Sequence, residues 1–130
     1  MPWPFGRTKP LGPRGEALAR RSLRRAGLKV LARNYRCPAG EIDLIALDRS
    51  TRAATGAETI VFIEVKTRSG GGLAEPEAAV DARKRRQVRR VADYYLAHHP
   101  AASYAVRFDI VSVVCRQGAK PRIRHIPDAF

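Results

Sequence analysis

Two acidic residues, Asp43 and Glu64, stand in segments that are otherwise almost entirely apolar. Asp43 lies in the run EIDLIAL, and Glu64 lies in the run TIVFIEVKT, which also contains Lys66. Residues two apart in an extended strand share a face, so Glu64 and Lys66 are expected to point the same way. If the two runs pair as neighbouring strands, Asp43 and Glu64 meet on one face of a sheet. An unpaired carboxylate in such a strand costs several kcal/mol, and a hard divalent ion such as Mg²⁺ would offset that cost.

A Mg²⁺ or Mn²⁺ ion between these carboxylates predicts a hydrolytic site that acts on phosphodiesters. Such an ion lowers the pKa of a bound water and neutralises charge on the phosphate. Lys66 can orient the attacking water or stabilise the transition state. Glu16, on an upstream helix, can add an outer carboxylate or help to seat a second ion. The candidate catalytic residues are therefore Glu16, Asp43, Glu64 and Lys66, with Asp43 and Glu64 as metal ligands.

Each of these residues also has an ordinary structural explanation. Glu16 can be a first-turn acid that is favoured by the helix dipole and paired with Arg20 at i+4. Glu64 and Lys66 can be a surface alternation on an edge strand, although the apolar run around them argues against an edge. Asp43 can lie on the solvent face of a half-exposed strand.

Two helices and five strands must position these residues. Hydrophobic periodicity and breaker residues predict helices over 14–26 and 80–98, a polar loop over 48–58 and a flexible connection over 69–77. The predicted strands cover, in chain order, residues 28–35, 41–47, 59–67, 104–115 and 121–126. The order α-β-β-β-α-β-β predicts an α/β fold, a mixed sheet flanked by helices.

The predicted buried stripes fix how the two helices face the sheet. The first helix is expected to bury Ala19, Leu23 and Ala26 and to end at Gly27, and the same stripe extends back to Glu16. The stripe of the second helix consists of Val88, Val91, Ala92 and Tyr95.

The length of 130 residues fits one domain, with residues 1–13 as an irregular arm and residues 14–130 as the folded unit. A net charge of +13 predicts a polyanionic partner, nucleic acid first and an anionic membrane surface second. The charge is uneven, with +9 over residues 1–36, −3 over 37–79 and +7 over 80–130. This distribution is expected if the basic flanks hold a polyanion while the acidic centre acts on it.

The two cysteines, Cys37 and Cys115, have neither the number nor the spacing of a disulfide framework or a zinc site. They are expected to be free thiols in a reducing cytosol. No apolar run resembles a signal peptide or is long enough to span a bilayer. These features predict a cytoplasmic protein.

A run of basic residues opens the second predicted helix. Arg86 and Arg90 form a like-charge pair at i,i+4, which costs a few tenths of a kcal/mol, and contact with phosphates would explain that cost better than solubility does. A solvated helix face is the simpler alternative. The candidate nucleic-acid-binding residues are Arg68, Arg83, Lys84, Arg86 and Arg90.

Several motifs in order resemble one known family. They are GEALARRSLRRAGLKVLARNYRCPAGEIDLIALD, VFIEVKTRSGGG, EAAVDARKRRQVRRVADYYL and RFDIVSV. Together they resemble the bacterial YraN-type predicted endonucleases of the restriction-endonuclease-like superfamily, which are regarded as distant relatives of archaeal Holliday-junction resolvases. The resemblance covers about residues 14–130 and implies that superfamily's fold.

Carried onto this chain, the resemblance implies metal ligation by Asp43, Glu64 and the backbone carbonyl of Val65. It implies that Lys66 is the catalytic lysine and Glu16 the accessory acid. The implied activity is that of a hydrolase, a Mg²⁺- or Mn²⁺-dependent endonuclease acting on DNA, with branched DNA as a candidate substrate.

Other functions compete with this one. A non-catalytic nucleic-acid-binding module of the same fold would use the same basic flanks. A peripheral membrane protein leaves the acidic strands unexplained. A two-fold homodimer is a further expectation, because a duplex or junction offers two strands related by symmetry.

Overall fold

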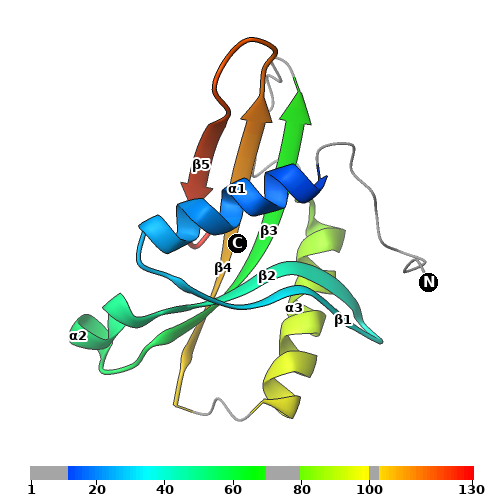
Figure 1. Ribbon diagram of the computed structural model, residues 1–130. Coiled ribbons are helices and arrows are strands. Elements are labelled where there is room, and N and C mark those ends of the chain that lie inside the picture. The colour runs from blue at the N-terminus through cyan, green and yellow to red at the C-terminus, as the bar shows by residue number, and fades with distance from the viewer. Residues whose placement is uncertain (1–11, 70–79, 100–102) are drawn as a thin grey trace.

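The computed structural model describes residues 12–69, 80–99 and 103–130, which form one five-stranded sheet with helices on both sides (Figure 1). The strands are β1 (Lys29–Cys37), β2 (Gly40–Asp48), β3 (Thr59–Ser69), β4 (Ala105–Cys115) and β5 (Arg122–Ile126). The two long helices are α1 (Gly12–Arg25) and α3 (Ala82–His98). This is the mixed sheet flanked by helices that the sequence predicts, and it is compatible with the restriction-endonuclease-like fold.

The strands lie side by side in chain order, β1-β2-β3-β4-β5. Neighbours are antiparallel except for β3 and β4, which are parallel because α3 lies between them in the chain. The predicted loop over 48–58 contains two short helical turns, η1 (Arg49–Thr51) and α2 (Arg52–Thr55). These turns join β2 to β3, so the two strands of interest form a hairpin.

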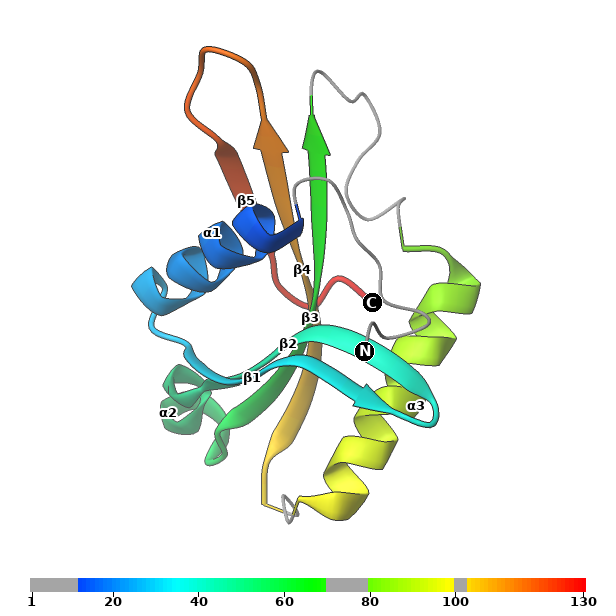
Figure 2. The ribbon, with the colours of Figure 1, turned by 45° about the vertical axis from the view of Figure 1, so that its right-hand side comes forward.

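The two long helices lie on opposite sides of the sheet (Figure 2). A hydrophobic cluster lies between the sheet and each of them. On β3, Val61, Ile63 and Val65 pack in the cluster that contains Ala19 and Leu23 of α1. Ile60 and Phe62 pack in the cluster of α3, together with the predicted stripe Val88, Val91, Ala92 and Tyr95. A strand covered on both faces is apolar at nearly every position, which explains the continuous run in its sequence.

One predicted core position of α1 is wrong. Ala19 and Leu23 are fully buried, but Ala26 is exposed. The helix ends before Ala26 in a Schellman motif, in which Gly27 (φ 90°) donates to the carbonyl of Arg24 and Leu28 donates to that of Leu23. This turn buries Leu28 in place of Ala26.

The other end of α1 lies very close to β3. A Cβ atom on Gly15 would overlap the side chain of Thr67. Gly15 therefore allows α1 to lie this close to β3, the strand that carries Glu64.

The predicted arm and the 69–77 connection lie largely outside the described residues, although Gly12 and Pro13 belong to α1. Cys37 and Cys115 are both free thiols. Within the described ranges, no helix is long and apolar enough to cross a membrane.

Candidate functional site

Asp43 and Glu64 meet where β2 and β3 stop pairing as a regular ladder. The register ends at the pair Leu44 and Ile63, and the next two positions are Asp43 and Glu64. There the side chains bridge the strands: the Val65 amide donates to Asp43 Oδ2 at 2.7 Å, and the Asp43 amide donates to Glu64 Oε2 at 3.4 Å. The two carboxylates that the sequence singles out thus lie side by side, each holding a backbone amide of the other strand.

Glu64 faces α3 rather than solvent. Its side chain is only 4% exposed, and Phe62, two residues before it on the same face, lies in the core under α3. Lys84, on the first turn of α3, places Nζ 3.3 Å from Glu64 Oε1. Lys66 continues the same face of β3 and is half-buried.

Glu16 makes a different contact. Its carboxylate accepts hydrogen bonds from Asn34 Nδ2 at 3.2 and 3.3 Å. Asn34 has a left-handed backbone (φ 50°) and lies on β1 at the position opposite Asp43, between the pairs Arg33–Leu44 and Tyr35–Ile42. Asn34 therefore connects α1 to β1, the neighbour of the strand that carries Asp43.

The site offers oxygen ligands for a hard divalent ion, but only a few of them. Among the described residues, no three Asp, Glu, His or Cys side chains gather closely enough to hold a metal. Glu16 is thus not in one ligand group with Asp43 and Glu64. Two carboxylates with a backbone carbonyl still match Mg²⁺, which commonly takes one or two carboxylates and completes its shell with water and phosphate. The buried Glu64 carboxylate already attracts one cation, the Lys84 ammonium, so the residues present fit such an ion.

The arginines of α3 divide into two groups. Arg83, Arg86 and Arg90 are exposed and share one side of the helix by their spacing. Arg85 and Arg89 instead lie over aromatic rings, with Arg89 5.4 Å from the Phe108 ring centre. The exposed group is the part of the predicted nucleic-acid-binding set that faces solvent, and Arg68 is half-buried near the end of β3.

A basic groove lies on the α1 side of the sheet, between α1 and the start of β5. It has a volume of about 580 Å³. Arg21, Arg25 and Lys120 supply its charge, while Leu18, Pro121 and Ile123 supply its apolar lining. None of the described residues that line it is acidic, which favours an anionic ligand.

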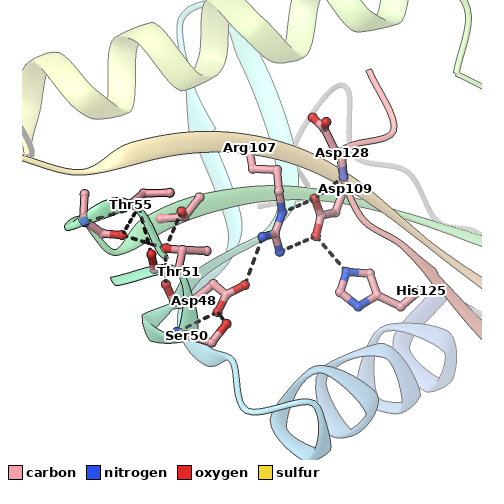
Figure 3. A network of polar contacts seen from close by, with 10 residues as sticks. Asp48, Ser50, Thr51, Thr55, Arg107, Asp109, His125 and Asp128 are labelled. Carbon is pink, nitrogen blue, oxygen red and sulfur yellow. Dashed lines mark hydrogen bonds and ion pairs between the residues drawn. The ribbon is translucent and has the colours of Figure 1, made fainter. Parts of the chain in front are cut away.

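A polar network also joins β2, β4 and β5 (Figure 3). Asp109 is completely buried and binds Arg107 through two hydrogen bonds of 2.9 and 3.0 Å. His125 lies 2.7 Å from Asp109 Oδ2, and Arg107 also reaches Asp48 at 2.9 Å. Nothing in the sequence marks these residues as a group, although the acid inside the apolar run RFDIVSV is a signal.

This network keeps its two acids ionised. Burial alone would raise the pKa of Asp109, but hydrogen bonds from His125, Arg107 and the Asp128 amide outweigh burial and hold that pKa below its ordinary value. The pKa of Asp48 is also lowered, because bonds from Ser50 and Arg107 outweigh its burial. The network therefore stabilises the fold through charge.

Comparison with known proteins gives consistent matches over most of the chain. The model of the family described as "Uncharacterised protein family UPF0102" matches residues 15–113. A UPF0102 protein of Nocardia farcinica is 44% identical over 125 residues, covering 96% of this chain and 92% of the relative. One of Moorella thermoacetica is 46% identical over 120 residues, covering 92% and 93%. One of Geobacter metallireducens is 43% identical over 122 residues, covering 94% and 93%.

Proposed function

The chain belongs to the uncharacterised protein family UPF0102, the YraN-type family that its motifs resemble, and from that premise we propose that it is a metal-dependent endonuclease that hydrolyses phosphodiester bonds in DNA. The observation that carries the proposal is that Asp43 and Glu64 lie side by side where the β2–β3 ladder ends, each accepting a hydrogen bond from a backbone amide of the other strand. Branched DNA is a candidate substrate.

The proposed ligands of the metal are the carboxylates of Asp43 and Glu64 and the backbone carbonyl of Val65. A Mg²⁺ or Mn²⁺ ion bound there would lower the pKa of a water molecule and neutralise charge on the phosphate. The hydrogen bond from the Val65 amide to Asp43 fixes one carboxylate before any ligand arrives. The burial of Glu64 fixes the other, so both would meet a substrate already oriented.

The basic residues would hold the DNA. Lys66 lies on the Glu64 face of β3, where its ammonium would stabilise charge that develops on the phosphate. Arg83, Arg86 and Arg90 would contact the phosphate backbone from α3, and Arg68 would do so from β3. The net charge of +13 supports binding to a polyanion, since the acidic centre alone would repel one.

Cleavage of labelled linear, nicked and four-way-junction DNA tests the proposal, with Mg²⁺, Mn²⁺ or EDTA. We expect cleavage only with a divalent ion and a loss of more than about 100-fold in Glu64→Gln. Glu58→Gln is the matched control, because Glu58 precedes the other end of β3 and pairs at the surface with Arg52. Equal cleavage by wild type and Glu64→Gln would refute the proposal.

The basic groove supports a second candidate, a nucleic-acid-binding module that does not cut. The groove lies on the α1 side of the sheet, whereas Glu64 faces α3, so the groove can bind an anion without the carboxylates. Salt-dependent DNA binding that is lost on replacing Arg21, Arg25 and Lys120 by alanine, with no cleavage and no Mn²⁺ binding by calorimetry, would establish this candidate instead.

A further inference from the structure

Lys84 already contacts one of the two carboxylates proposed to hold the metal. The Lys84 ammonium is 3.3 Å from Glu64 Oε1, and Glu64 is one of the two carboxylates proposed as metal ligands. We infer that Lys84 is a built-in counter-cation, which occupies the metal's place against Glu64 until an ion displaces it. This inference rests on the proposed function, because it concerns the same site.

The first turn of α3 holds Lys84 in this position. Asp81 caps the helix by accepting a hydrogen bond from the Lys84 amide at 2.9 Å. Arg85 Nε donates to the carbonyl of Val80 at 2.8 Å, and Val80 is buried. The backbone of Lys84 is thus fixed on both sides, and its side chain runs from a fixed point to Glu64.

Because Glu64 is buried, its ion pair with Lys84 matters for stability. A carboxylate that is 4% exposed has little water to balance its charge, so it depends on a neighbouring cation. The Lys84 side chain is 32% exposed, so its ammonium can swing to solvent when another cation arrives. A divalent ion against Glu64 Oε1 would repel the Lys84 ammonium that lies 3.3 Å from that oxygen, so the pair lowers the affinity of the site for metal.

Removing the ammonium should therefore tighten metal binding. We expect Lys84→Met to bind Mn²⁺ about tenfold more tightly than wild type, a change equivalent to about 1.4 kcal/mol. In EDTA the same variant should unfold at a lower temperature, because the buried Glu64 carboxylate loses the Lys84 ammonium. Saturating Mn²⁺ should then raise its Tm by more than it raises that of wild type, since a tighter ligand stabilises the folded state more.

Calorimetric titration with Mn²⁺ and thermal unfolding with Mn²⁺ or EDTA test this on the full chain. Lys29→Met is the matched control, because it makes the same chemical change at an exposed position of β1 and should leave Mn²⁺ affinity within about twofold of wild type. If Lys84→Met does not fold, Lys84→Gln takes its place, because it removes the charge but keeps a hydrogen-bond donor. It too should bind Mn²⁺ more tightly than wild type does.

The outcomes separate this inference from the proposed function. Mn²⁺ binding by wild type with equal or weaker binding by the Lys84 variant overturns the counter-cation role and leaves the metal site intact. A tenfold change that also appears in Lys29→Met overturns it too, because the effect would then be one of net charge. Absence of Mn²⁺ binding in both wild type and the Lys84 variant refutes the metal site itself, and the inference with it.

Discussion

Replacing Arg107 by methionine should destabilise the protein strongly. Arg107 donates to Asp109 through Nε and Nη2 and to Asp48 through Nη1, with all three distances between 2.9 and 3.0 Å. Methionine keeps much of the side-chain volume but removes all three bonds. It leaves a completely buried carboxylate and a nearly buried one without their shared cation.

The size of the loss follows from the burial of these groups. Removing one partner of a buried ion pair costs about 3–5 kcal/mol, because the other charge stays buried without compensation. For a domain of 130 residues the entropy of unfolding is about 0.27 kcal/mol/K, so this loss corresponds to a decrease in Tm of about 11–18 °C.

The loss should also depend on pH. The pKa of Asp109 is depressed in the folded state, so its ionisation stabilises the protein at pH values above about 4 and loses that effect as the pH falls through the folded pKa. Without Arg107 the folded pKa of Asp109 rises, since burial is opposed by fewer hydrogen bonds. The difference between wild type and Arg107→Met is therefore largest at neutral pH and shrinks in acid.

Urea unfolding near neutral pH and at about pH 4 measures both effects. Arg116→Met is the control, because Arg116 is exposed beyond the end of β4 and its replacement should change stability by less than about 0.5 kcal/mol. A loss below about 1 kcal/mol for Arg107→Met, or a loss of equal size at both pH values, would refute the account of a network stabilised by charge.

Two further predictions concern DNA binding and helix packing. Arg86→Ala and Arg90→Ala should each reduce the slope of log affinity against log salt by about 0.9 for duplex DNA, as measured by fluorescence anisotropy, and an unchanged slope would place the DNA elsewhere. Gly15→Ala should lower the free energy of unfolding by about 1–3 kcal/mol, because its Cβ overlaps Thr67, and a thermal melt identical to that of wild type would show that α1 can move away.

The sequence was sufficient to predict the helices and strands and their order. The apolar residues repeat with the spacing of a helix in the two helices and form nearly continuous runs in the buried strands. The unbroken apolar run around Phe62 indicated a strand covered on both faces, and α3 and α1 provide that cover. The meeting of Asp43 and Glu64 was also predictable, because consecutive strands commonly pair and each acid stood alone in an apolar run.

What escaped prediction depends on register and on local backbone conformation. Ala26 fits the helical stripe, but the turn at Gly27 ends the helix one residue earlier. The contact of Asn34 with Glu16 depends on an irregular position of β1. Lys84 stood in a run of like charges, and nothing in the sequence distinguished the one that reaches Glu64. These contacts are set by the relative placement of elements, which composition and spacing do not specify.

The two outer strands have a consequence for how copies of the protein meet in solution. β1 carries exposed Lys29, Arg33 and Arg36, and β5 carries exposed Arg122 and Arg124. Positive side chains on an open strand oppose edge-to-edge association with another chain, and the irregularity of β1 between Val30 and Ala32 adds to this. These edges are therefore disfavoured as the contact surface of the expected two-fold dimer. The same charges keep copies of the protein apart, so precipitation should be greatest where an added polyanion just neutralises them.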